Sequence, residues 1–392
     1  MKKIIDYYLP FSYSFKLIAQ RSSSRLLILL FFLSPFALHA QNAGEGDTTP
    51  AWRQALGGAV IGLPTVQAQS AVVVCDGGNV KAYSTKGTPL WNYYARGRVS
   101  PFITRSPEGT SYISRTNGIF IAVNRAGREL WRITPGGALS SQAIPGWDGR
   151  LFIPTGKKIS CYTGSGNPLW QKTFENPIAL GPKLDREGGI LLVLDTGELL
   201  LLDPFGKTYS QTLPEVPAEI LSIGVPGEKS RIMVFYKSGA AEIIDPASVN
   251  PKPYTLPRLP YPLLAGVSRE NSAAVVLNNG QVLRISGKDG SFLWTADSHL
   301  KGNAGTNDVS MLYDDRGIYV LSKSGATGFT EDGRRLWVIH LDGAAAIPAF
   351  GDDGILYSGG TDWILYAYKL EERLRLQKQS LYGPVPDGTY GT

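Results

Sequence analysis

The residue types best suited to chemistry are scarce in this chain of 392 residues, which contains only 3 His and 2 Cys. Cys75 and Cys161 stand alone in separate apolar runs, so we expect two buried free thiols and no metal or redox pair. His299 and His340 each follow a tryptophan-containing segment, and we expect both to be surface or packing residues and not ligands.

Two pairs of adjacent aspartates, Asp314-Asp315 and Asp352-Asp353, resemble the start of a calcium-binding loop. Each pair is soon followed by a glycine, Gly317 or Gly354, and this pattern is typical of a tight turn. No Ser-His-Asp grouping can be argued, because so few histidines remain and no nucleophile-elbow motif is present. The sequence therefore predicts no catalytic residue, no metal ligand and no cofactor.

Tryptophans divide the chain at a regular interval. The spacings are 39, 40 and 39 residues along Trp52, Trp91, Trp131 and Trp170, and 43 residues from Trp294 to Trp337. Three further intervals fit between Trp170 and Trp294, with Tyr209 and Tyr254 near the two missing positions. Trp147 and Trp363 do not fit the series. A period of this length is typical of repeat folds in which each unit is one supersecondary motif.

Each unit contains a strand-like run, a polar turn, a glycine and then the tryptophan, as in NVKAYSTKGTPLW at 79–91. The other strand-like runs of a unit end in Asn-Gly, Asp-Gly or Ser-Gly pairs, which indicate tight hairpins. Four strands per repeat predict an all-β fold: a single eight-bladed β-propeller of four-stranded antiparallel blades, with seven blades as the alternative count. The residues expected to dock neighbouring blades are Trp52, Trp91, Trp131, Trp170, Trp294, Trp337, Gly87, Gly127, Gly166, Gly290 and Gly333.

The chain beyond the repeats divides into short segments. Residues 1–40 carry basic residues, the apolar run Leu26–Leu38 and a small residue at the end, which predicts a secretory signal peptide. An uncleaved anchor or a start codon placed too early are the alternatives. Residues 41–49 are a linker, 50–376 form the propeller and 377–392 are a flexible tail. We expect residues 50–56 to supply the outer strand of the last blade, unless Arg373–Leu376 do so and Trp52 is only a cap.

The basic character of the chain lies mostly in its first forty residues. The formal charge of the whole sequence is +6, but removal of residues 1–40 takes away five basic residues and one acidic residue and leaves +2. Nucleic-acid binding requires a clustered basic surface, so this class of function is not favoured. The mature protein is expected to be monomeric and to have no membrane span.

The repeated units resemble the pyrroloquinoline-quinone-type propeller repeat over residues 50–370. That group includes quinoprotein dehydrogenases and non-enzymatic exported propellers of the BamB type. The number of units and the predicted export favour the second group. This resemblance implies a periplasmic scaffold that binds protein partners in the cell envelope and reaches the outer membrane through them, and not an enzyme. The alternative is a propeller that binds a quinone or another small ligand in a central pocket lined by carboxylates and aromatics.

Two segments are candidates for partner binding. The proline-rich segment Pro246–Pro262 could present Tyr254, Arg258, Leu259 and Tyr261 to a partner. A loop that only lengthens a blade with a degenerate repeat would give the same pattern. A small basic cluster combines Arg96-Gly97-Arg98 with Arg105, for which an ordinary solvated surface is the alternative.

Overall fold

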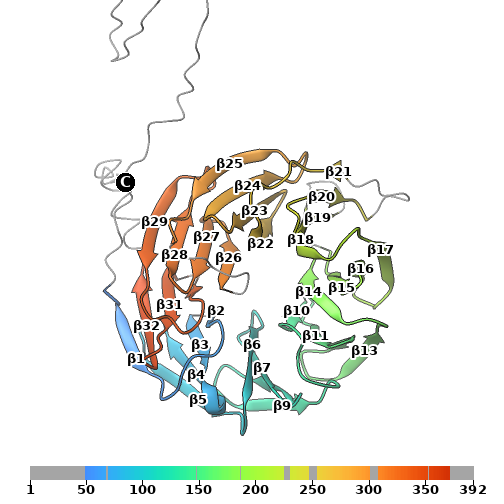
Figure 1. The fold of residues 1–392 in the computed structure, drawn as a ribbon. Coiled ribbons are helices and arrows are strands. Elements are labelled where there is room, and N and C mark those ends of the chain that lie inside the picture. The colour runs from blue at the N-terminus through green and yellow to red at the C-terminus, as the bar shows by residue number, and fades with distance from the viewer. Residues whose placement is uncertain are drawn as a thin grey trace, which may run out of the picture. The chain divides into compact units, whose positions relative to one another are not determined.

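In the computed structural model, the described residues form 32 strands in eight four-stranded antiparallel sheets, which stand around a common centre as blades (Figure 1). The structure describes residues 49–67, 69–146, 148–185, 187–224, 230–246, 254–300, 308–351 and 353–370. The predicted signal peptide, nearly all of the linker, the alternative closing segment 373–376 and the tail lie outside these residues, as do Trp147 and Asp352. The prediction of eight blades is confirmed, and the alternative count of seven is wrong.

The first four blades follow one another along the chain, each running from its inner to its outer strand. Blade 1 consists of β2 (Thr65–Gln67), β3 (Ser70–Val74), β4 (Asn79–Ser84) and β5 (Pro89–Tyr94); blade 2 of β6 (Val99–Arg105), β7 (Ser111–Arg115), β8 (Phe120–Val123) and β9 (Glu129–Ile133); blade 3 of β10 (Ile144–Pro145), β11 (Leu151–Thr155), β12 (Lys158–Tyr162) and β13 (Pro168–Thr173); blade 4 of β14 (Ile178–Leu184), β15 (Ile190–Leu194), β16 (Glu198–Leu202) and β17 (Thr208–Thr212).

The last four blades repeat this order, except that the outer strand of blade 8 comes from the other end of the chain. Blade 5 consists of β18 (Pro217–Ile223), β19 (Arg231–Tyr236), β20 (Ala241–Ile244) and β21 (Tyr254–Thr255); blade 6 of β22 (Leu263–Arg269), β23 (Ser272–Leu277), β24 (Gln281–Ser286) and β25 (Phe292–Asp297); blade 7 of β26 (Val309–Tyr313), β27 (Ile318–Ser322), β28 (Gly325–Phe329) and β29 (Arg335–His340); blade 8 of β30 (Ala349–Phe350), β31 (Ile355–Gly359), β32 (Ile364–Lys369) and β1 (Trp52–Ala55).

The ring closes through the antiparallel pairing of β1 with β32, in which Trp52 is opposite Ala367 and Ala55 is opposite Ile364. This pairing covers the strand that would otherwise leave an open edge in the last blade. The described residues contain no α-helix, only a short 3-10 turn at Asp76–Gly78, and hence no helix able to span a membrane.

Burial explains why the second strands are almost continuously apolar. Every residue of β3, β11, β15 and β27 is buried, because these strands are covered by a neighbouring blade on both faces of the sheet. The outer strands instead alternate between exposed and partly buried residues, as in β5 and β13. Their partly buried positions face the next blade.

The tryptophans of the outer strands pack on glycines of the following blade. A Cβ atom placed on Gly127 would lie 2.6 Å from Cβ of Trp91, and one placed on Gly333 would lie 2.7 Å from Cδ2 of Trp294. Both glycines adopt positive φ, of 77° and 82°, which adds a second reason for glycine at these turns. The same stacking joins Trp52 to Gly87, Trp131 to Gly166 and Trp170 to Gly206.

The indole N–H groups add directional bonds to this packing. Nε1 of Trp52, Trp131, Trp170 and Trp294 each donates to a backbone oxygen in a turn of the next blade, at 2.8 to 3.0 Å. Trp337 differs, because its ring packs on Tyr319 of its own blade and on Phe350 of blade 8, with centroids 5.9 and 5.6 Å away. Its Nε1 is buried and has no partner among the described residues.

Blade 5 departs from the tryptophan pattern. Tyr254 pairs with Ile243 as Tyr209 pairs with Leu201, so it holds the repeat position, yet it is 56% exposed. The contact with the glycine of the next blade is made by Leu256, whose Cδ2 occupies the space next to Gly290.

The connections alternate between the two faces of the ring, because successive strands are antiparallel. We define face 1 by the turns between the first and second and between the third and fourth strands of each blade. Face 2 carries the turns between the second and third strands and the connections between blades.

Candidate protein-interaction surface

The cysteines and histidines lie apart from one another. Cys75 and Cys161 are buried and unpaired, and burial raises the pKa of each thiol to about 11, which leaves little reactive thiolate at neutral pH. His340 is partly buried at the end of β29, and its Nδ1 has no partner within the part of the chain that the structure describes. The backbone N–H of His299 donates to Oδ1 of Asp297 at 2.7 Å in a tight turn.

Asp314 and Asp353, two of the aspartates that resembled calcium ligands, stabilise turns through hydrogen bonds to the backbone. Oδ1 of Asp314 accepts hydrogen bonds from the backbone N–H groups of Arg316 and Gly317, at 2.8 and 3.2 Å, and Oδ2 pairs with the guanidinium of Arg316 at 2.6 Å. Oδ1 of Asp353 accepts from the backbone of Ile355, and its Oδ2 accepts from the hydroxyl of Tyr357 at 2.7 Å. No group of three or more His, Cys, Asp or Glu that could share a metal ion occurs among the described residues.

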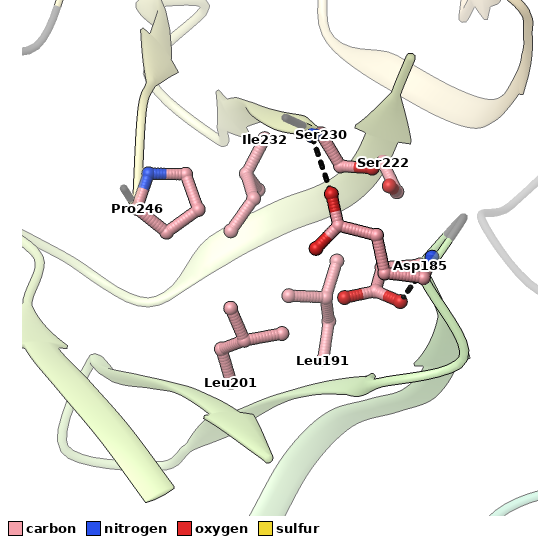
Figure 2. A pocket seen from close by; sticks show the side chains of 8 residues that line it. Asp185, Leu191, Leu201, Ser222, Ser230, Ile232 and Pro246 are labelled. Carbon is pink, nitrogen blue, oxygen red and sulfur yellow. Dashed lines mark hydrogen bonds between the residues drawn. The ribbon is translucent and has the colours of Figure 1, made fainter. Parts of the chain in front are cut away.

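A small cavity opens between blades 4 and 5 on face 1 (Figure 2). Its volume is about 110 Å³, and its walls include Leu191, Leu201 and Ile232, with Asp185 and Glu187 at one side. Both carboxylates are occupied: Oε1 of Glu187 accepts from the N–H of Ser230 at 3.2 Å, and Oδ1 of Asp185 accepts from two backbone N–H groups. Sites that bury a drug-sized ligand usually measure about 300–1,000 Å³, so this cavity is too small for such a ligand.

A larger cavity of about 320 Å³, which we call the inner cavity, opens on face 2 around the inner ends of several blades. Its lining is mostly aliphatic and includes Ile61, Leu63 and Ile347, with one aromatic side chain, Phe102, and no carboxylate. The quinone alternative requires a central pocket with carboxylates and several aromatics, and this lining does not supply them.

The proline-rich segment continues on face 2 as a strap, residues 256–262, between blades 5 and 6. The side chains of Leu256 and Leu259 are only 5% exposed and pack in the core between these blades. The N–H groups of the two leucines donate to Ala241 O at 2.8 Å and Gly239 O at 2.9 Å. The expectation that Leu259 is presented to a partner is therefore wrong, because this side chain is one of the two anchors of the strap.

The other candidates of the segment are accessible. Tyr254 is 56% exposed, Tyr261 is 46% exposed, and exposed Arg258 donates from Nη2 to Ser238 O at 2.6 Å. Pro257 fixes φ between the two anchors, and Pro260 and Pro262 fix φ just after the second anchor. Exposed tyrosine and arginine side chains on such a preorganised backbone are the residue types that dominate binding energy at protein interfaces.

The predicted basic cluster does not form as expected. Arg96 and Arg98 are exposed on face 2, whereas Arg105 is 7% exposed and lies at the face 1 end of β6. Its Nη1 donates to the backbone oxygens of Gln67 and Ser70, both at 2.9 Å, so it joins blade 2 to blade 1. Burial lowers the pKa of Arg105 to about 10. Arg105 is thus a structural residue and not part of a surface.

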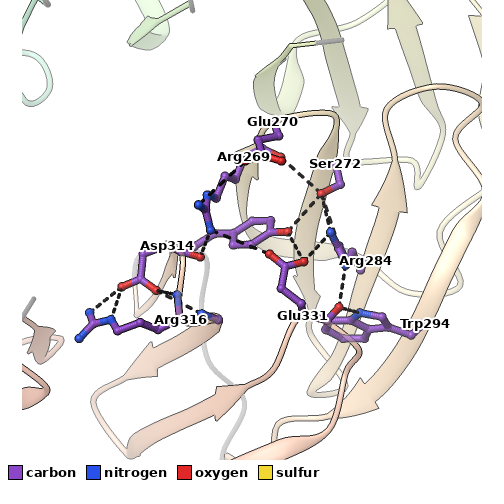
Figure 3. Close-up of polar contacts among 10 residues, drawn as sticks. Arg269, Glu270, Ser272, Arg284, Trp294, Asp314, Arg316 and Glu331 are labelled. Carbon is purple, nitrogen blue, oxygen red and sulfur yellow. Dashed lines mark hydrogen bonds and ion pairs between the residues drawn. The ribbon is translucent and has the colours of Figure 1, made fainter. Parts of the chain in front are cut away.

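A polar network that was not foreseen from the sequence joins blades 6 and 7 on face 1 (Figure 3). The guanidinium of Arg284 pairs with Oε2 of Glu331 at 2.6 Å, and the hydroxyl of Tyr313 donates to the same atom at 2.9 Å. Arg269 and Arg284 flank the Tyr313 ring, each 5.8 Å from its centroid. Arg284 and Glu331 lie 47 residues apart and Arg269 and Tyr313 lie 44 apart, each about one repeat, and this spacing is the signal that could have found the network. Because Arg269 and Arg284 both lie within 4.0 Å of the Glu331 carboxylate, and Arg269 also lies 4.0 Å from that of Glu270, we expect the network to stabilise the blade contact.

The described residues form an eight-bladed β-propeller with a proline-rich strap on face 2 that carries exposed Tyr261. No protein-family model and no curated protein sequence matches the chain.

Solved structures with a similar fold cover most of the chain. BamB from Moraxella catarrhalis has a TM-score of 0.59 and 14% identity, over 82% of this chain and 99% of that chain. Sqt1 of Saccharomyces cerevisiae has a TM-score of 0.64 and 9% identity, over 81% and 97%. The computationally designed protein Ika8 has a TM-score of 0.62 and 12% identity, over 80% and 98%. At these identities the comparisons show the fold.

Proposed function

We propose that this chain is an exported, non-enzymatic propeller scaffold that binds a protein partner through the strap on face 2. The observation that carries the proposal is the combination of exposed Arg258 and Tyr261 in the strap, and of exposed Tyr254 just before it, with the two buried leucine anchors. Because the anchors fix the backbone before binding, little conformational entropy is lost when a partner docks.

The finer proposal concerns compartment and process. The basic and apolar N-terminal segment supports export to the periplasm, and the similarity to BamB supports a role in outer-membrane protein assembly or envelope maintenance. In this proposal the protein acts without a cofactor. A saturable absorbance change on adding pyrroloquinoline quinone and calcium to the purified protein would contradict the scaffold proposal and favour the small-ligand alternative.

Site-specific photocrosslinking in intact cells tests the strap. A photoreactive phenylalanine analogue replaces Tyr261, and in a matched control it replaces Tyr209, which is 37% exposed on the outer strand of blade 4. We expect discrete crosslinked protein bands from position 261 and not from position 209. No crosslink at 261, or the same bands at both positions, would remove the support for a partner at the strap.

A further inference from the structure

Trp363 lies at an unusual place for a bulky residue. It ends the turn between β31 and β32 on face 2, has a φ of 65° and is 54% exposed. Left-handed φ values are disfavoured for residues with a Cβ atom, and for a bulky side chain they are true outliers. An outlier of this kind justifies a search for the function that retains it.

Five other blades show which residue the turn itself requires. The corresponding position is Gly78, Gly118, Gly197, Gly239 and Gly280 in blades 1, 2, 4, 5 and 6, with φ values from 83° to 90°. In four of these blades the glycine oxygen accepts a hydrogen bond from the chain just after the outer strand, as the oxygen of Trp363 accepts from Leu56 N–H at 2.8 Å. Glycine would therefore keep the whole backbone arrangement of this turn without the strain.

Among the described residues, the indole of Trp363 makes no aromatic contact that would offset this strain, and 54% of the residue is exposed. Every tryptophan of the repeat series is partly or fully buried against neighbouring aromatic, aliphatic or glycine positions, whereas Trp363 makes no aromatic contact with another described residue. Its backbone N–H donates to Gly360 O at 3.2 Å, a bond that any residue except proline could make.

The loops that pack on this turn are apolar. Residues 56–64 (LGGAVIGLP) and 341–347 (LDGAAAI) run from the turn to the inner cavity, where they contribute Leu63 and Ile347. The turn is hydrogen-bonded to both loops. Leu56 N–H of the first loop donates to Trp363 O at 2.8 Å, and Thr361 N–H of the turn donates to Gly343 O of the second loop at 2.7 Å. We call Trp363 with these two loops the Trp363 surface.

The charge of the Trp363 surface is negative. Asp342 and Asp362 are the only charged residues within the two loops and the turn. Lys323, the one cation among the described residues that line the inner cavity, is paired with Asp308 at 2.8 Å. The negative charge of this surface would repel an anionic membrane. A protein segment with apolar and basic side chains would instead complement both its apolar residues and its negative charge.

We propose that the Trp363 surface docks a segment of a partner protein that carries apolar and basic side chains. Trp363 is the anchor of this contact, since exposed tryptophan is the residue type most enriched among interface hot spots. The proposal rests on the scaffold function only in requiring a protein partner, and it places a contact in blade 8, separate from the strap.

The test uses the full chain and two labelled 18-residue amphipathic peptides, one of Leu and Lys and one of Leu and Glu, with fluorescence anisotropy at low salt. We expect the Leu/Lys peptide to bind at least about tenfold more tightly than the Leu/Glu peptide. Trp363→Ala should weaken that binding at least about tenfold, Trp363→Phe should weaken it less, and Asp342→Asn should weaken it at low salt only. Phe205→Ala, which removes a 77% exposed aromatic from face 1, is the matched control and should leave binding unchanged.

A stability measurement makes the test independent of binding. Trp363→Gly should raise the urea midpoint of unfolding and still lose peptide binding, because it relieves the strain and removes the anchor. A lowered midpoint would show that the indole stabilises the fold, and it would overturn the proposal. Equal affinity for both peptides, unchanged binding by Trp363→Ala, or preferred binding to phosphatidylcholine/phosphatidylglycerol vesicles would overturn it as well. Crosslinking at Tyr261 is unaffected by these outcomes, so failure of this surface and failure of the scaffold function are distinguishable.

Discussion

Substitution of a blade-docking glycine tests the packing argument quantitatively. Gly333→Ala places a methyl group 2.7 Å from Cδ2 and 2.8 Å from Cγ of Trp294, well inside the usual carbon–carbon contact of about 3.5–4.0 Å. It also forces alanine to adopt a φ of 82°. The backbone strain costs about 1–2 kcal/mol, and overpacking adds about 1–3 kcal/mol. We therefore expect a loss of about 2–5 kcal/mol in the free energy of unfolding.

A matched glycine isolates the tryptophan contact. Gly149 has almost the same φ, 78°, but a Cβ atom placed there would meet nothing within 4 Å. Gly149→Ala should therefore cost only the backbone part, about 1–2 kcal/mol, in urea unfolding followed by circular dichroism. In a Trp294→Ala background, Gly333→Ala should also fall to that value, since the ring is gone. Equal losses for the two glycines, or an unchanged loss without the indole, would refute the stacking argument.

Three further variants or conditions have defined outcomes. Arg105→Met should lower the free energy of unfolding by about 1–3 kcal/mol, because it leaves the oxygens of Gln67 and Ser70 without their donor; a neutral effect in urea unfolding would contradict the role given to this guanidinium. The hydrogen bond from Arg132 holds the pKa of Glu129 at about 2, below the usual value of about 4.3, so its contribution to stability is present above pH 4.3 and should disappear as the pH falls towards 2. The difference in urea midpoint between the wild type and Glu129→Gln, followed from pH 5 to pH 2, measures this loss, and a constant difference would count against it. Cys75 and Cys161 should not react with a thiol-specific disulfide reagent at pH 8 until the protein is unfolded in guanidinium chloride; rapid labelling of the native protein would show that they are not buried.

The fold was predictable because its main contact uses rare residue types at fixed intervals. In most repeats the contact of a flat indole with a turn glycine leaves two recognisable residue types in the sequence, and the count of eight blades follows from their spacing. Leu256 replaces the indole in blade 5, and a leucine among other leucines carries no such signal. The prediction therefore placed Tyr254 correctly in register and expected it to be presented to a partner, but it did not find that Leu256 makes the contact with the next blade.

The candidate surface was only partly predictable, because burial alternates over single residues in irregular segments. Arg258 and Leu259 are neighbours, yet one is exposed and the other is an anchor, and only the blade packed behind them decides which. Arg105 was misassigned for a related reason. Its charge suggested a position on the surface. In the structure its guanidinium is buried and donates hydrogen bonds to backbone oxygens of the preceding blade.

The pairing of β1 with β32 imposes an order on the assembly of the molecule. Trp52 is among the first residues of the ring to be synthesised, but its partner Ala367 is among the last. Contacts of such long sequence separation carry a large loop-closure entropy and form late. Blades 1 to 7 can form in chain order, each packing on the blade before it. During this time β1 remains unpaired, because β32 has not yet formed. The short length of β1 and the polar side chains of Arg53 and Gln54 limit pairing with a wrong strand while β1 is unpaired. We therefore expect the pairing of β1 with β32 to be the last step of folding.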